Sequence, residues 1–106
     1  MKLLTKEILK RLPPLYTHDG NSPDQVNVVV KFFNPYGAAT WYATEYDPET
    51  GNFFGYVDLG DRRFAELGYF SLEELESIKL PGGLGIERDI HFGYDHTLAD
   101  VMKKRL

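Results

Sequence analysis

The sequence lacks cysteine altogether, which excludes disulfide bonds, thiolate metal sites and cysteine nucleophiles. It also lacks a long apolar run. The segment 1–12 carries five charged side chains, so we expect neither a signal peptide nor a membrane span there. Basic residues are outnumbered, with 12 Lys and Arg against 16 Asp and Glu, and the net charge of −4 disfavours a broad electrostatic grip on nucleic acid. These absences predict a soluble, cytoplasmic protein.

The composition that remains is typical of one globular domain. The chain has 106 residues, of which 42% are hydrophobic, 14% aromatic and 26% charged. A chain of this length buries enough surface for one core, and a division would leave two marginal pieces. We therefore expect a single domain over residues 1–106.

Alternating and β-branched runs separated by turns predict an antiparallel sheet of about five strands, mostly a meander. Asn34–Gly37 and Asp47–Gly51 have the residues of tight turns. The expected strands are 25–33, 38–46, 52–59, 64–70 and 86–92.

Three helices are expected around this sheet, each with a hydroxyl side chain at its N-terminus. Thr5 precedes a short N-terminal helix that Pro13 and Pro14 end. Ser71 begins the helix after the fourth strand, and Thr97 caps a last helix over 98–106. The fold class is therefore α+β.

The middle of the chain is acidic. The segment between Trp41 and Glu76 contains only two arginines but nine acidic residues, namely Glu45, Asp47, Glu49, Asp58, Asp61, Glu66, Glu73, Glu74 and Glu76. Such a surface suits a basic protein partner, or it only keeps the domain in solution.

The densest polar cluster lies in the expected fifth strand. Glu87, Asp89 and His91 would share one face of a strand, and carboxylates and imidazole are ligands for divalent metals. Neighbours on a strand face are roughly 6.6 Å apart, however, so three in a row do not close around one ion without a bulge. The alternative is a solvent-facing strand side with Ile86, Ile90 and Phe92 on the core side. Arg88 would fall on the apolar side and need a carboxylate partner or a path to solvent.

No other catalytic pattern is present in the sequence. The serines lie in a loop, at a helix cap and on a helix, away from any strand-turn-helix elbow. Gly82–Gly85 is rich in glycine but lacks the lysine and hydroxyl of a phosphate loop and the spacing of a dinucleotide fingerprint. We therefore expect no cofactor and favour a non-catalytic domain.

Adjacent aromatic residues occur on four expected strands, as Phe32-Phe33, Trp41-Tyr42, Phe53-Phe54 and Tyr69-Phe70. Alternation puts one ring of each pair on each face of the sheet, so the second face also carries rings. Three explanations stay open: helices and loops cover that face, a protein partner or second copy binds it, or it stacks single-stranded bases. The candidate binding residues are Trp41, Tyr42, Phe54 and Arg88.

The chain also resembles a known family. The resemblance runs from Leu3 to Phe92 through LLTKEILKRLPPLY, VVKFFNPYGAATWYATEYDPETGNFFGYVDLG, ELGYFSLEELESI and GLGIERDIHF. These segments are similar to the bacterial family called domain of unknown function 2958. The resemblance implies a setting in bacteria, phages and plasmids, alone or beside domains linked to mobile DNA and antirestriction. It implies no activity and carries over no catalytic residues.

Together these features predict a protein-interaction module whose partner is an unidentified protein. The first alternative is a nucleic-acid-associated accessory protein, and the second is a metal-dependent hydrolase built on Glu87, Asp89 and His91.

Overall fold

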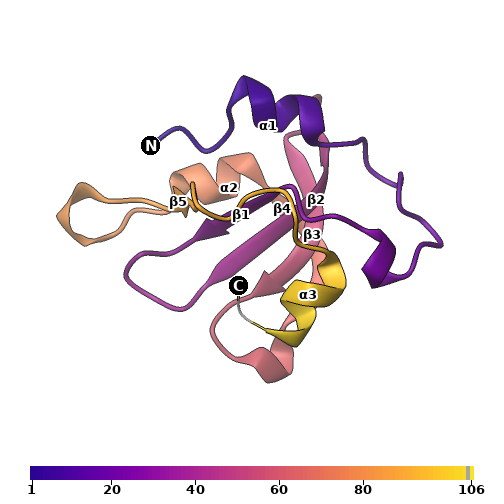
Figure 1. Cartoon of the computed structure of the whole chain (residues 1–106). Helices are drawn as coiled ribbons and strands as arrows, with labels where there is room; N and C mark the ends of the chain where they lie inside the picture. The colour runs from indigo at the N-terminus through magenta and orange to yellow at the C-terminus, as the bar shows by residue number, and fades with distance from the viewer. Residues whose placement is uncertain (105) are drawn as a thin grey trace.

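The protein is built on a five-stranded antiparallel sheet, as the sequence predicts. The computed structural model describes residues 1–104 and 106. The strands follow the order β4-β3-β2-β1-β5, so β4 and β5 form the two edges. Figure 1 shows the sheet with the helices around it. Their bounds are Val30–Phe33 for β1, Thr40–Asp47 for β2, Asn52–Asp58 for β3, Glu66–Ser71 for β4 and Glu87–Arg88 for β5.

Three short helices surround the sheet, and each begins at the hydroxyl cap that the sequence indicates. They are α1 at Lys6–Arg11, α2 at Leu72–Ser77 and α3 at Leu98–Lys103. The side-chain oxygen of each capping residue accepts from a first-turn amide, at 3.2 Å for Thr5, 3.0 Å for Ser71 and 3.2 Å for Thr97. Single 3₁₀ turns lie at Pro23–Gln25 (η1), Arg62–Phe64 (η2) and Pro81–Gly83 (η3).

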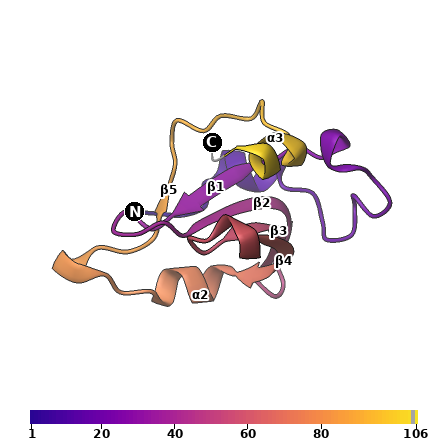
Figure 2. The same cartoon turned by 90° about the horizontal axis from the view of Figure 1, so that it is seen from below.

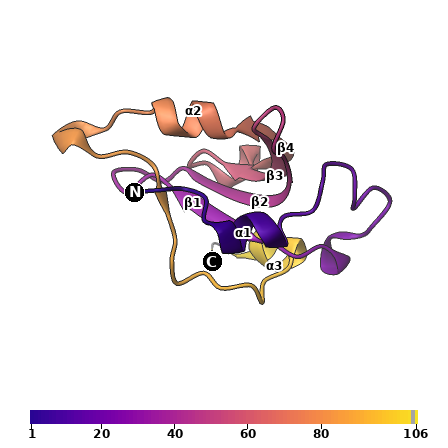
Figure 3. The same ribbon diagram turned by 90° about the horizontal axis from the view of Figure 1, so that it is seen from above.

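The sheet has a core on each face. Figures 2 and 3 show α2 and α3 on opposite sides of the strands. Trp41 belongs to the first core, with side chains of α1 and α2, and Tyr42 belongs to the second, with side chains of α3. In the first core the Phe53 ring lies 5.4 Å from Phe32 and 5.1 Å from Phe70. The expected split of aromatic pairs between the two faces is therefore confirmed for these rings.

The expected fifth strand is wrong beyond Arg88. The Asp89 carboxylate accepts from the amide of His91 at 2.9 Å, and the Asp89 carbonyl accepts from Phe92 at 3.3 Å. These bonds make a turn, so alternation stops there and Ile90 is 64% exposed instead of facing the core. An apolar–polar period of two fits a short strand followed by a turn as well as it fits a full strand.

Other element boundaries also differ from the expectation. The expected first strand overlaps η1 at Gln25, and pairing with β2 begins only at Val30. Phe64 lies in η2 and is 76% exposed, so β4 starts two residues later than expected. The last helix ends at Lys103, and residue 105 of the expected span lies outside the described residues.

None of the helices in the described part of the chain is long and apolar enough to cross a membrane.

Candidate functional site

One half of the second sheet face is left open by α3. The helix packs on Tyr42 and Tyr56, which lie opposite each other on β2 and β3. The next row of the same face runs across three strands from Glu45 through Phe54 to Tyr69. Tyr69 is 56% exposed, and its ring meets that of Phe54 edge to face at 5.1 Å. This row forms the floor of the candidate site.

A β-bulge in β2 places Glu45 in that row. The register shifts between Ala43, which pairs with Gly55, and Glu45, which pairs with Phe54. Thr44 is the additional residue, and its buried hydroxyl donates to the carbonyl of Phe54 at 3.1 Å. A bulge re-aims the side chain that follows it. The carboxylate therefore faces the open half of the sheet.

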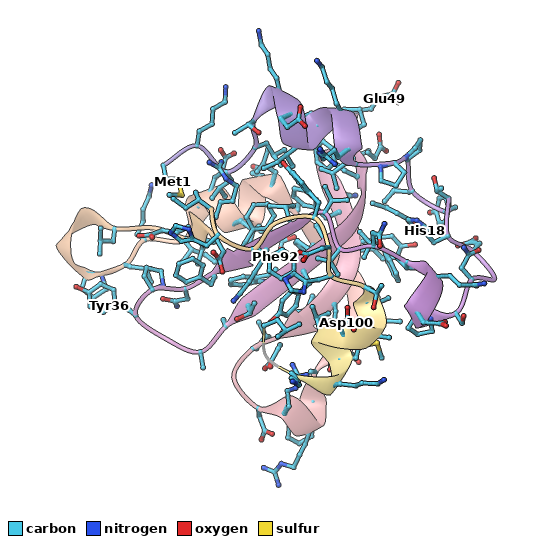
Figure 4. All side chains as sticks on the ribbon, in the orientation of Figure 1. Met1, His18, Tyr36, Glu49, Phe92 and Asp100 are labelled. Carbon is cyan, nitrogen blue, oxygen red and sulfur yellow. The ribbon has the colours of Figure 1, made fainter. Side chains whose placement is uncertain are left out.

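The Glu45 carboxylate holds the loop between α1 and η1 against the sheet. It accepts from the amides of Tyr16 at 2.9 Å and His18 at 2.8 Å, and from the His18 ring Nδ1 at 2.8 Å. Glu45 is only 3% exposed, so these donors offset the loss of its hydration. They also hold Tyr16 at a φ of +72°, a conformation rare for a tyrosine. Figure 4 labels His18 on this loop, at the flank of the sheet.

The loop and the open row enclose a cavity of about 280 Å³ that we call the Tyr69 pocket. Its lining includes the rings of Tyr16, Phe54 and Tyr69, the side chains of Leu67 and Leu98, the carboxylates of Asp19 and Glu45, and the His18 ring, whose Nδ1 lies 2.8 Å from Glu45. Among the described residues, no lysine or arginine lines it.

Two carboxylates give the Tyr69 pocket acidic character, and the His18 ring lies beside one of them. The hydrogen bond with the Tyr16 side chain is the largest cause that raises the pKa of Tyr69 above its ordinary value. Desolvation raises this pKa further, and so do the charges of Asp19 and Glu45. The negative charges of Asp19 and Glu45 oppose deprotonation of the Tyr69 hydroxyl, and the same charges favour the binding of a cation.

The pocket adjoins a free sheet edge. In the described residues β3 is the only strand paired with β4, so the outer side of β4 has no neighbouring strand. Leu67 and Tyr69 of β4 are 43% and 56% exposed. An uncovered edge strand with apolar side chains is a template for pairing with another chain. The edge and the pocket together form the candidate site.

The structure separates the four candidate binding residues. Trp41 and Tyr42 are buried in the two cores, and only Phe54 reaches the pocket. Arg88 lies on β5, at the opposite edge of the sheet. Its guanidinium donates to the carbonyl of Lys2, a backbone oxygen in place of the carboxylate that was one of the two expected solutions.

The three candidate metal ligands do not converge. Glu87 lies on β5, whereas Asp89 and His91 belong to the turn after it. Asp89 also lies 3.4 Å from the ammonium of Lys31. No group of three histidines or carboxylates among the described residues has the arrangement of a metal site.

Sequence reasoning missed most of this site. Tyr16 and His18 lie in a segment that reads only as a loop, 29 and 27 residues from Glu45 in the chain. One signal was present: Glu45 is a charged residue inside a run of apolar and aromatic residues, AATWYATEY. A carboxylate within a buried strand needs donors from elsewhere in the fold.

Comparison with known proteins gives a family and no function. A family model described as a protein of unknown function, DUF2958, matches residues 3–104. The match covers nearly the whole chain, so the chain belongs to this family, as the resemblance of its segments predicts. No curated protein and no solved structure matches the chain.

Proposed function

We propose that this member of the DUF2958 family is a protein-interaction domain that binds an extended, basic segment of a partner protein along the free edge of β4. The observation that carries the proposal is the uncovered edge strand with exposed Leu67 and Tyr69. Backbone groups on the outer side of such a strand bind an added strand, and its side chains supply specificity.

The charge around β4 favours a basic partner. Glu66 on the strand and Glu73 and Glu76 on α2 are exposed, and no ion pair involving them is present in the described residues. The arginines of this region are engaged, since Arg62 pairs with Asp58 at 3.3 Å and Arg63 with Asp61 at 2.7 Å. A basic segment complements this surface, whereas a nucleic-acid backbone or a second copy with its own net charge of −4 is repelled.

The proposal is tested with labelled extended peptides of alternating Val and Lys, or Val and Glu, with fluorescence anisotropy as the measurement. We expect the lysine peptide to bind and the glutamate peptide not to bind. Replacing both Glu66 and Glu73 by lysine should lower the affinity for the lysine peptide by about fivefold or more, because two attractive charges become repulsive.

The matched control is Glu87→Lys, which makes the same charge change on β5 at the opposite edge. Glu87→Lys should lower the affinity for the lysine peptide less than Glu66→Lys or Glu73→Lys, each made as a single variant. The proposal is contradicted if Glu87→Lys has the same effect as Glu66→Lys, if the glutamate peptide binds equally, or if single-stranded DNA binds more tightly than the lysine peptide. A stable dimer joined through β4 in the free domain would also contradict it.

A further inference from the structure

We infer that the Tyr69 pocket binds the cationic side chain of a lysine or arginine from the segment that pairs with β4. This inference rests on the proposed function and specifies what the pocket recognises. It follows from the position of the pocket, from its rings and from its carboxylates.

The pocket lies where a side chain of an added strand would reach it. Leu67 and Tyr69 point to the second face of the sheet, and Tyr69 forms one wall of the pocket. In a strand paired with β4, every second side chain would project over that same face, beside these two residues. A long side chain next to Tyr69 would extend toward Phe54 and the loop that Glu45 holds.

The rings supply aromatic surface for a cation. The rings of Phe54 and Tyr69 meet edge to face at 5.1 Å. The Tyr16 side chain, on the loop, forms a hydrogen bond with Tyr69. Aromatic faces attract ammonium and guanidinium groups, and several rings around one cavity are a recurrent site for them. Leu67 and the ring edges would pack against the methylene groups of the same side chain.

The carboxylates distinguish a cation from an apolar side chain. Glu45 already accepts three hydrogen bonds, so it acts on a bound group through its field. The Asp19 carboxylate has no hydrogen-bond partner or ion pair within the described residues, which leaves it free to pair with an ammonium or a guanidinium. A leucine or methionine would gain nothing from either charge and would leave Asp19 unpaired.

The test uses small probes that carry the side-chain chemistry alone. The full chain labelled with ¹⁵N is titrated with n-butylammonium, n-butylguanidinium and the neutral n-butanol, and binding is followed by NMR shifts of the Phe54 and Tyr69 amides. We expect at least one cation to bind about tenfold more tightly than butanol. Whichever cation binds more tightly identifies lysine or arginine as the preferred side chain.

Two variants assign the binding to the pocket. Tyr69→Leu should lower the affinity for the preferred cation by about tenfold, and Asp19→Asn should lower it by about threefold. The control is Tyr36→Leu, which removes a tyrosine of similar exposure, 59%, from the β1–β2 turn at the other end of the molecule (Figure 4). If Tyr69→Leu unfolds, Asp19→Asn on the exposed loop still decides the matter. Equal binding of butanol, or equal loss in Tyr36→Leu, overturns the inference.

The same variants separate this inference from the proposed function. If the lysine peptide binds at β4 but Tyr69→Leu and Asp19→Asn leave its affinity unchanged, the pocket inference fails and the proposed function stands. If the small cation binds in the pocket but no peptide binds, the edge proposal fails. The cation specificity of the pocket then stands without it.

Discussion

Gly55→Ala is expected to unfold the domain, or to cost about 3 kcal/mol or more of its unfolding free energy. A methyl group at Gly55 would lie 1.8 Å from the carbonyl oxygen of Tyr42 and 2.8 Å from its carbon. These are backbone atoms of the adjacent strand, so no side chain can turn aside to make room. The bulge beside Ala43 brings β2 this close to β3, and urea denaturation followed by circular dichroism measures the cost.

Gly68 provides the matched control, because it pairs with Gly55 on the neighbouring strand. A methyl group there meets nothing within 4 Å. Gly68→Ala should therefore change the stability by no more than about 0.5 kcal/mol. An equal loss in the two variants would show that glycine flexibility matters at both positions and that close approach of β2 does not.

Glu45→Ala is expected to lower the free energy of unfolding by about 3 kcal/mol. The substitution removes the acceptor for the amides of Tyr16 and His18 and for the His18 ring, and it also removes the force that holds Tyr16 at positive φ. The loop should detach from the sheet, and the Tyr69 pocket should lose the wall that this loop forms. Urea denaturation gives the stability, and NMR shifts of residues 14–21 report the loop.

Glu49→Ala is the control for this change, since Glu49 is an exposed acid on the turn that follows the same strand (Figure 4). It should alter the stability by no more than about 0.5 kcal/mol. A loss in Glu45→Ala no larger than that in Glu49→Ala would mean that the carboxylate does not organise the loop.

The order of the elements was predictable because local chemistry determines it. The caps at Thr5, Ser71 and Thr97 and the turn at Asp47–Gly51 depend on residues within a few positions of one another. The end of β5 was not predictable. The Asp89 amide still donates to the carbonyl of Lys31 on β1 at 2.9 Å, as in a strand, but its carboxylate accepts from the amide two residues later and begins the turn.

The candidate site was less predictable because long-range pairing forms it. The direction of Glu45 follows from a register shift against β3, which no pattern within β2 alone reveals. The nine acidic residues in the middle of the chain also have different structural roles, which their number alone does not reveal. Glu45 and Asp58 are buried with partners, whereas Glu66, Glu73 and Glu76 remain exposed around β4. Only the fold shows which of these charges are buried and which are exposed.

Amide hydrogen exchange with and without the lysine peptide, resolved by residue, tests whether β4 is the edge that binds the peptide. A strand added to the sheet protects the amides of β4 that point away from β3, so every second amide of Glu66–Ser71 should exchange more slowly at saturation. The amides of β5, at the opposite edge, should be unchanged. Protection at β5 or α3 in place of β4, or no protection of β4 when the peptide is saturating, would contradict the assignment of β4 as the binding edge.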